Sequence, residues 1–353
     1  MATVLIQNSR IFDGHRYLEG DVFIRDGIIE TLGGVSQEKA GFTFDAAGMT
    51  VMPGLVDVHM HIKGFSPEKW AVPADCCLSF GVTAAAEATA DFGGVDTARA
   101  LGVKTCVFVP CDTRQTPGLL QRAEEALEKY GPLSAGIKTF YDADNDPELK
   151  SADPLAELSE FAHKKGYRLT VHTANSPIPM RELLAALNPG DIATHIFHGD
   201  GHTVAEDDFA CLFEAKQRGV LLDISPAGTG HIDFSIFQNA IAAGALPDLI
   251  GTDLVWQILY TRGGRFGLTS CMTMARLLGM KEEDILPCVT ANAGKALDRP
   301  WGVLTEGGNA DIAVLEYGKE PFDMTDWKGF RLQSDLGYRC HLTIADGKIV
   351  YRR

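Results

Sequence analysis

The chain has 353 residues, of which 45% are hydrophobic and 22% are charged, a composition typical of a soluble globular protein with a sizeable core. Acidic residues outnumber basic ones by 47 to 32, and the net charge of -15 argues against nucleic acid or an anionic membrane surface as a partner. We therefore expect a small-molecule substrate, and we expect the protein to be a homo-oligomer.

The ends and the cysteines of the chain bear on its compartment. The first residues lack the basic segment and apolar core of a signal peptide, and no stretch approaches the roughly 18 apolar residues of a membrane span. The eight cysteines are scattered without a CxxC pair, so we interpret them as reduced thiols that mostly fill the core. These features predict a cytoplasmic protein.

Both ends of the chain predict short antiparallel strands around Asp-Gly turns, because Asp-Gly supplies the positive φ angles of a tight turn. The strands and turns are expected at 3–6, 21–24, Asp26-Gly27, 28–32, 341–345, Asp346-Gly347 and 348–351. Two hairpins at opposite ends predict one small β-sandwich domain, built from residues 1–52 together with 302–353.

Between these ends, strand-like and helix-like patterns alternate. Apolar runs occur at 54–61, 82–88, 103–110, 134–141, 167–173, 191–197, 219–225 and 248–253, and helical patterns at Leu119–Tyr130, Leu155–Lys165 and Phe209–Arg218. Near-continuous apolar strands are typical of a parallel sheet buried on both faces, and eight such strands close a barrel. We predict an α/β fold with a (β/α)8 TIM barrel over residues 53–301.

The first of these runs, Pro53 to His61, ends in His59 and His61. Residues two apart on a strand point the same way, so both imidazoles face one side. A bare His-x-His is more often structural than metal-binding. Here, however, four more polar residues end later predicted strands: Lys138, His172, His195 and Asp253. Because barrel strands end at one rim, these side chains are expected to converge, and a bound metal would compensate for their burial.

Lys138 is the unexpected member, because an ammonium group would repel a metal ion. A buried lysine readily loses its proton, and the neutral amine can react with carbon dioxide to form an anionic carbamate. Such an anion could bridge two metal ions. The alternative is an ordinary ion pair of Lys138 with Asp142 or Asp144.

Together these motifs resemble the amidohydrolase superfamily. The resemblance rests on the sequence PGLVDVHMH, the strand-end lysine, Leu-Thr-Val-His at 169–172, Thr-His-Ile-Phe-His-Gly at 194–199 and Gly-Thr-Asp at 251–253, and it covers essentially the whole chain. The lysine-bridged binuclear branch includes dihydroorotases, hydantoinases and isoaspartyl dipeptidases. The segment 190–199 is most similar to dihydroorotase-like deacetylases.

The resemblance implies that His59, His61 and Asp253 hold one divalent ion, that His172 and His195 hold a second, and that a carbamate on Lys138 bridges them. Zinc is the expected metal, although manganese, iron and cobalt also suit these ligands. Two metal ions lower the pKa of a bridging water from about 15.7 to about 7, and Asp253 would act as the general acid and base. Hydrolysis of an amide or ester bond of a small acyl compound follows as the expected reaction.

Five further residues are candidates for binding the substrate. Loop histidines could bond an oxyanion or a carboxylate, and basic residues could hold a carboxylate; they are His198, His231, Lys63, Arg262 and Arg265. Each could equally be an ordinary loop or surface residue. His198 stands where the similar deacetylases carry asparagine, so the substrate is the least determined feature.

Three other functions stay open. The first is a cyclic-amide hydrolase of dihydroorotase or hydantoinase type. The second is a heterocycle deaminase, which normally works with one metal ion and without a bridging lysine. The third is a non-catalytic scaffold, which the full set of six ligands argues against.

Overall fold

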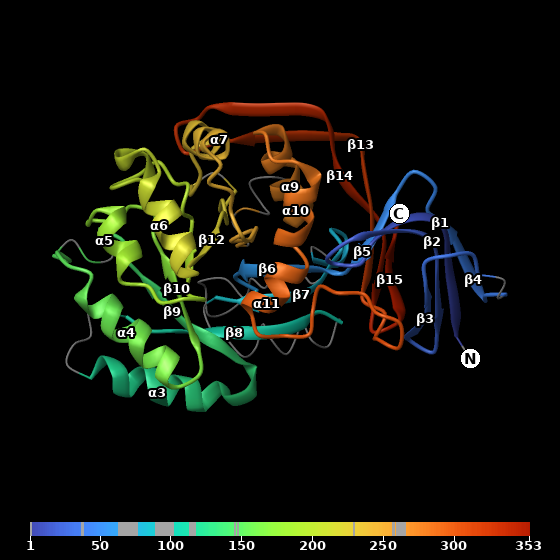
Figure 1. Cartoon of the computed structure of the whole chain (residues 1–353), viewed down its shortest axis with the longest axis horizontal. Coiled ribbons are helices and arrows are strands. Elements are labelled where there is room, and N and C mark those ends of the chain that lie inside the picture. The colour runs from blue at the N-terminus through green and yellow to red at the C-terminus, as the bar shows by residue number, and fades with distance from the viewer. Residues whose placement is uncertain are drawn as a thin grey trace.

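The computed structural model of the chain describes residues 2–36, 39–62, 77–88, 102–112, 118–144, 146, 148–228, 230–255, 258 and 266–353. The fold is mixed α/β, with a curled parallel sheet surrounded by helices and a second, mostly antiparallel sheet at one side (Figure 1). Among the described helices, none combines the length and the apolar character that crossing a membrane requires.

The second sheet contains strands from both ends of the chain. Its eight strands are β1 (Thr3–Phe12), β2 (Tyr17–Arg25), β3 (Ile28–Leu32), β4 (Phe42–Asp45), β5 (Thr50–Pro53), β13 (Ile312–Thr325), β14 (Arg331–Ala345) and β15 (Lys348–Arg352). They follow the order β15-β14-β13-β5-β1-β2-β3, with β4 paired to β1. The antiparallel pairing of β13 with β5 joins the two chain ends. This pairing links all eight strands into one sheet, so the predicted two-sheet sandwich is not evident from the hydrogen bonding.

The two predicted Asp-Gly turns lie against each other. Asp26 and Asp346 have φ angles of 50° and 46°, as the tight turns require. A Cβ atom on Gly347 would lie 2.0 Å from the Cα atom of Gly27, so only glycine fits this contact. The backbone of Ala310 connects the turns, donating to the Gly27 carbonyl over 2.8 Å and accepting from the Gly347 amide over 2.9 Å.

The parallel sheet contains seven strands in chain order, and each pairs with the next. They are β6 (Leu55–Met60), β7 (Val82–Glu87), β8 (Lys104–Pro110), β9 (Ser134–Phe140), β10 (Arg168–His172), β11 (Ile192–Thr194) and β12 (Leu221–Asp223). Seven of the eight predicted runs therefore form strands. β6 and β7 are buried along their whole length, as expected for strands covered on both faces.

The eighth predicted run, 248–253, forms no regular strand in the structure. Leu249, within the run, makes an isolated parallel bridge to Asp223 of β12, and Leu254, directly after the run, makes another to Met60 of β6. Asp253 has a φ angle of 50°, which is incompatible with an extended strand at the end of the run. The segment nevertheless lies between the last and the first strand of the curled sheet.

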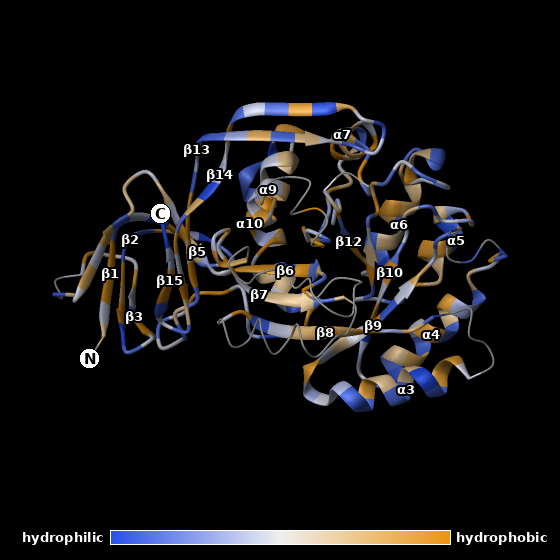
Figure 2. Ribbon diagram, turned by 180° about the vertical axis from the view of Figure 1, so that it is seen from behind, coloured by the Kyte–Doolittle hydropathy of each residue, from blue (hydrophilic) through white to orange (hydrophobic). Residues whose placement is uncertain are grey.

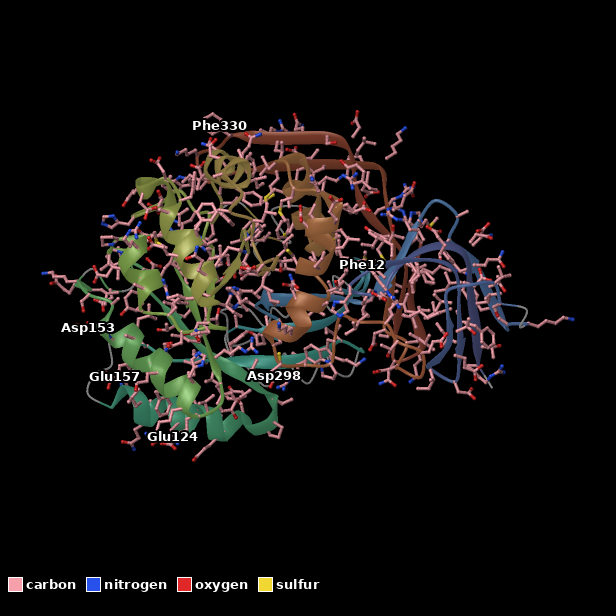
Figure 3. The ribbon with its side chains drawn as sticks, in the orientation of Figure 1. Phe12, Glu124, Asp153, Glu157, Asp298 and Phe330 are labelled. Atoms are coloured by element: carbon pink, nitrogen blue, oxygen red, sulfur yellow. The ribbon has the colours of Figure 1, made fainter. Side chains whose placement is uncertain are left out.

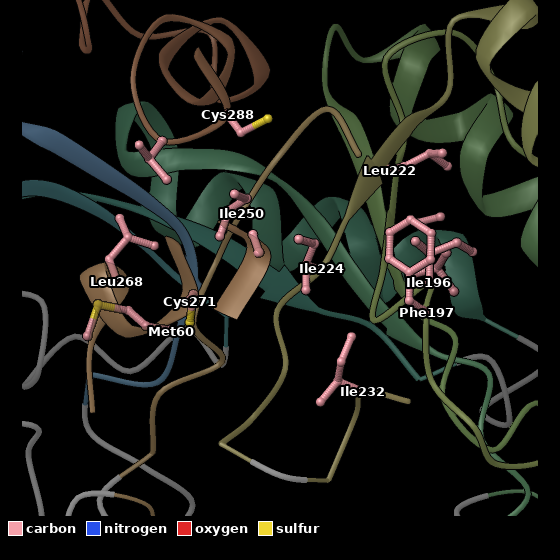
Figure 4. Close-up of a cluster of buried hydrophobic side chains, with 14 of the residues drawn as sticks. Met60, Ile196, Phe197, Leu222, Ile224, Ile232, Ile250, Leu268, Cys271 and Cys288 are labelled. Carbon is pink, nitrogen blue, oxygen red and sulfur yellow. The ribbon is translucent and has the colours of Figure 1, made fainter. Parts of the chain in front are cut away.

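Helices cover the outer face of the parallel sheet (Figure 1). They are α3 (Leu119–Tyr130), α4 (Asp153–Lys164), α5 (Met180–Ala185), α6 (Ala210–Arg218), α7 (Phe234–Ala243), α9 (Leu268–Leu277), α10 (Glu282–Cys288) and α11 (Ala291–Ala296). Three of them, α3, α4 and α6, match the predicted helical patterns. Figure 2 shows mainly hydrophobic residues on β6, β7 and β8, whereas the helices carry hydrophobic and hydrophilic residues in alternation. Figure 4 shows part of the core, where Ile224 and Ile250 lie among side chains from several elements.

The hairpin of β13 and β14 extends well beyond the sheet that contains the chain ends. We call residues 317–336 the arm; they run past α9 toward α7 (Figures 1 and 2). The amide of Tyr338, at the base of the arm, donates to the hydroxyl group of Thr273 on α9 over 2.9 Å. At the tip, the amide of Trp327 donates to the Ile232 carbonyl over 3.0 Å. The sequence patterns did not predict this arm.

Candidate metal centre

The carboxyl ends of the parallel strands surround a cavity of about 860 Å³. The residues of its wall that can bind a metal or a proton include His59, His61, Lys138, His172, His195, His231 and Asp253. All six predicted metal ligands therefore meet at one site. A larger groove of about 1800 Å³ lies between the arm and α9, and Ala227 and Ile258 line both spaces.

His59, His61 and Asp253 form the first group of potential ligands. The alternation of β6 turns both imidazoles to the same side, with ring centroids 5.5 Å apart. The Nε2 atoms of His59 and His61 lie 3.4 and 2.8 Å from Oδ1 of Asp253. All three residues are buried, and their potential ligand atoms lie within 4.8 Å of one another.

His172, His195 and His231 form the second group, again with potential ligand atoms within 4.8 Å of one another. The ring of His195 lies 4.6 Å from that of His172 and 4.4 Å from that of His231. The two groups are close neighbours, because Nε2 of His195 lies 3.7 Å from Oδ2 of Asp253. The sequence placed His231 among the substrate-binding candidates, whereas the structure places it beside the predicted ligands.

Hydrogen bonds to the outer ring nitrogens orient two of these imidazoles. Nδ1 of His195 lies 2.6 Å from the carbonyl oxygen of Ser225, which can only accept, so Nδ1 carries the proton and Nε2 is free to bind a metal. Nδ1 of His59 lies 2.9 Å from the Thr194 hydroxyl oxygen. That hydroxyl group donates to Asp223 over 2.5 Å, so it accepts from His59 and leaves Nε2 of His59 free as well.

The backbone at the site is bent to present these groups. His195 and Asp253 have φ angles of 63° and 50°, in the left-handed region that such residues seldom adopt, and backbone strain of this kind concentrates at functional sites. Gly251 precedes Asp253 by two positions, and a Cβ atom there would lie 2.3 Å from Oγ of Ser225 and 3.0 Å from Cβ of His59. The predicted Gly-Thr-Asp motif thus requires glycine at its first position.

Lys138 is completely buried and lies two residues before the carboxyl end of β9. Its Nζ atom has no hydrogen-bond partner among the described residues, and it lies 5.4 Å from the centre of the Phe140 ring. The alternative ion pair with Asp142 or Asp144 is not formed. Burial lowers the pKa of Lys138 to about 8, so part of the population is a neutral amine near neutral pH.

The ionisation of the other groups also suits metal binding. Burial, together with the nearby Lys138, lowers the pKa of His59 to about 4. Burial and the neighbouring His231 hold the pKa values of His172 and His195 well below the usual value, so these rings are neutral at pH 7. Burial opposes ionisation of Asp253, but contacts with His59 and His61 outweigh it and lower its pKa.

The remaining substrate-binding candidates have different placements. His198 is fully buried but is not part of the described cavity wall. Its Nδ1 atom accepts a hydrogen bond from the Asp200 amide over 3.3 Å. Lys63, Arg262 and Arg265 lie outside the described residues, so the structure does not test them.

Some residues of the site were missed by the sequence patterns. Thr194 and Asp223, which orient His59, looked like ordinary parts of their strands. Glu87 is fully buried at the end of β7, where it accepts a hydrogen bond from the Ile62 amide over 2.6 Å. A buried charged residue at the end of an apolar strand was a signal that could have identified Glu87.

The residues present fit divalent metal ions. The donor set combines neutral imidazoles and an ionised carboxylate, the ligand types that zinc and similar ions prefer. The buried Nζ atom of Lys138, without a partner in the described structure, is the position where a bridging anion would be needed. A metal-free cluster of this composition would leave several buried polar groups uncompensated.

Comparisons with known proteins agree with this geometry. The sequence profile of the amidohydrolase family matches residues 50–350. The chain is 27% identical over 346 aligned positions to a deacetylase of Agrobacterium fabrum, covering 86% of this chain and 80% of the relative. It is 26% identical over 438 aligned positions to a dihydroorotase of Anaeromyxobacter dehalogenans, covering 99% of this chain and 98% of the relative.

Solved structures show the same fold. An adenine deaminase matches with a TM-score of 0.85 at 21% identity, covering 100% of both chains. A dihydroorotase matches with a TM-score of 0.84 at 24% identity, covering 100% of this chain and 98% of the other.

Proposed function

Because the chain belongs to the amidohydrolase family, we propose that it is a metal-dependent hydrolase that removes a small acyl group from an amine or a hydroxyl group of a small carboxylate-bearing compound. The observation that carries the proposal is the convergence of His59, His61, Asp253, His172 and His195 in one cavity. Deacetylases are among its relatives, at 25–29% identity, which supports acyl removal.

The proposed cofactor is a pair of divalent ions, with zinc favoured. His59, His61 and Asp253 would hold one ion, and His172 and His195 would take part in holding the other. A carbamate formed from Lys138 and carbon dioxide would lie between them. When bound, the ions would supply an activated water at neutral pH and polarise the acyl carbonyl group.

Asp253 is the proposed general acid and base. Its net pKa is below the usual value, so its carboxylate is ionised at neutral pH and can accept the proton of the attacking water. The same proton then passes from Asp253 to the leaving nitrogen, as the bond between the acyl carbon and that nitrogen breaks. His59 and His195 would contribute as oriented metal ligands, because hydrogen bonds from Nδ1 to the Thr194 hydroxyl oxygen and to the Ser225 carbonyl leave Nε2 free in each ring.

Cyclic-amide hydrolysis is the second candidate function. The dihydroorotase of Anaeromyxobacter dehalogenans aligns over nearly the full length of both chains, which the deacetylase relative does not. The reaction would use the same groups, because opening a cyclic amide also breaks a bond between a carbonyl carbon and nitrogen. Heterocycle deamination is a weaker alternative, since Lys138 lies in the cavity wall and that activity normally needs no bridging lysine.

A parallel assay tests the proposal. The zinc-loaded protein is incubated with N-acetyl amino acids, dihydroorotate, hydantoins and adenine, and product release is measured for each. Release of acetate, abolished in Asp253→Asn and retained in His202→Ala, is the expected result. His202 bonds to Glu206 through a partly exposed side chain and is not part of the described cavity wall. Turnover of cyclic amides alone would overturn the deacylase assignment, and release of ammonia from adenine would favour a deaminase.

The proposal also includes the domain architecture, the cellular compartment and the oligomeric state. The bridges of 249–254 to β6 and β12 support a closed (β/α)8 barrel over residues 53–301, and the sheet that joins strands of 1–52 to strands of 302–353 supports one composite β-domain built from both ends of the chain. The seven described cysteines are all buried, as expected for thiols that fill the core of a protein of the reducing cytoplasm. A homo-oligomer that acts on a small molecule, without nucleic acid or membrane partners, completes the proposal.

A further inference from the structure

The loop after β12 brings an additional imidazole to the second group of potential ligands. The Nε2 atoms of His231 and His195 both lie 3.7 Å from Oδ2 of Asp253, so the two rings direct the same nitrogen toward the same point. The ring of His231 also packs edge-on against that of His172, with centroids 4.9 Å apart. Three imidazoles therefore surround one position.

The backbone holds His231 at this position through three contacts. Its own amide donates to the Pro226 carbonyl over 3.2 Å, the amide of Asp233 donates to the Phe197 carbonyl over 2.9 Å, and Ile232 accepts from Trp327 of the arm over 3.0 Å. The same loop provides the Ser225 carbonyl that orients His195. One loop thus fixes both the orientation of His195 and the place of His231.

We propose that His231 is a third imidazole ligand of the metal ion held by His172 and His195. The inference rests on the proposed metal centre, but not on the reaction that it catalyses. Two imidazoles alone would leave the second ion dependent on the carbamate of Lys138. A third imidazole gives that ion three protein nitrogens, which is the number of protein ligands that holds many catalytic zinc ions.

His231 differs from the other members of the group in its access to solvent. Its side chain is 29% exposed, against 10% for His172 and 1% for His195. It therefore lies at the mouth of the cavity, where a ligand can be displaced without unfolding the site. The second ion would accordingly bind with His231 as its outermost ligand.

Titration of the metal-depleted full-length protein with cobalt tests the inference, with binding followed by visible absorption and metal content measured by mass spectrometry. Loss of an outer-shell partner typically costs roughly 10- to 100-fold in metal affinity, so loss of a direct ligand should cost at least as much. In His231→Ala and His231→Gln, the affinity for one of the two cobalt ions is expected to fall by at least about tenfold. Their absorption spectra should also change, while the other ion is unaffected and His202→Ala behaves as wild type.

A combination with Lys138 sharpens the test. Lys138→Ala is expected to bind the second cobalt ion with measurable affinity. The Lys138→Ala/His231→Ala double variant is expected not to bind it. Unchanged cobalt affinities and spectra in both His231 variants, with circular dichroism showing intact folds, would overturn the inference. A wild-type protein that binds two ions but hydrolyses no acyl substrate would refute the proposed function and leave this inference standing.

Discussion

The carboxylate of Asp57 accepts a hydrogen bond from the hydroxyl group of Thr252 over 2.6 Å, which ties the first strand of the parallel sheet to the residue before Asp253. The Thr252 amide donates to the same carboxylate over 3.0 Å. The Asp253 amide then donates to the carbonyl of His59 over 2.7 Å. The position of Asp253 opposite His59 therefore depends on Asp57, which is completely buried in the PGLVDVHMH motif.

Thr252→Val should separate Asp253 from this anchor. The substitution keeps the shape of the side chain but removes the donor to Asp57 and the acceptor for the Leu254 amide. Leaving buried polar groups without partners costs about 1–3 kcal/mol each, so the free energy of unfolding should fall by at least that amount. Urea denaturation of the metal-depleted protein measures the change. Thr252→Ser retains the hydroxyl group, so its free energy of unfolding should fall much less. An equal decrease in both variants would show that the hydroxyl group does not anchor Asp253.

The sequence predicted the parallel sheet well because its signals are local and strong. The runs that became β6 and β10 are mostly apolar segments with histidines at their carboxyl ends, and strand period alone places His59 and His61 on one side. The convergence of Lys138, His172, His195 and Asp253 followed from a single rule, that parallel strands end at one rim.

Other features could not be read from the sequence because they depend on contacts between distant segments. Thr194 acts on His59 only through a hydroxyl group that Asp223 orients, and nothing in the local pattern marks it. The loop course that brings His231 beside His195 depends on left-handed backbone at Ser225 and Ala227. The arm was missed because alternation predicts a strand but not how far a hairpin extends beyond its sheet.

Carbamate formation at Lys138 should depend on pH in a definite direction. Burial lowers the pKa of Lys138 to about 8, and only the neutral amine reacts with carbon dioxide. Below pH 8 the neutral fraction falls about tenfold per pH unit, so the rate of carbamate formation at constant dissolved carbon dioxide should rise between pH 6 and pH 8 and level off above. Carbon-13 NMR of the metal-depleted protein, with the labelled bicarbonate adjusted at each pH to keep dissolved carbon dioxide constant, follows the growth of the carbamate signal. Lys138→Arg should show no protein carbamate signal; a signal that persists there would assign the carbamate to another amine.

His198 should make the protein less stable in acid. Burial, together with His231, lowers the pKa of His198 to about 4, below the unfolded value of 6.5. Between these values the unfolded chain binds a proton that the folded chain does not, so stability falls as the pH decreases from about 6.5 toward 4. The contribution approaches about 1.4 kcal/mol per pH unit within that window. His198→Leu should remove it, so that urea denaturation of wild type and variant, compared at pH 7.5 and pH 5, gives a smaller loss for the variant. An identical pH dependence in both proteins would mean that His198 does not titrate in this range.

The arm tip should influence the metal centre through Asp326. This carboxylate is buried and accepts hydrogen bonds from the amides of Phe330 over 2.9 Å and Phe234 over 3.2 Å. It therefore joins the tip to the start of α7, three residues after His231. Figure 3 shows Phe330 at the far end of the arm. Asp326→Ala leaves both amides without this acceptor and should destabilise the protein by about 1–3 kcal/mol.

Asp326→Ala should also lower the affinity for the second cobalt ion, because the loop that carries His231 loses one of the contacts that hold it in place. The matched control is Asp323→Ala on the exposed part of the arm, where the carboxylate pairs with Arg331 and such a pair contributes about 0–1 kcal/mol. Cobalt titration and urea denaturation are carried out on both variants. A stability loss in Asp326→Ala without any change in cobalt affinity would show that the arm supports the fold of α7 but does not position His231.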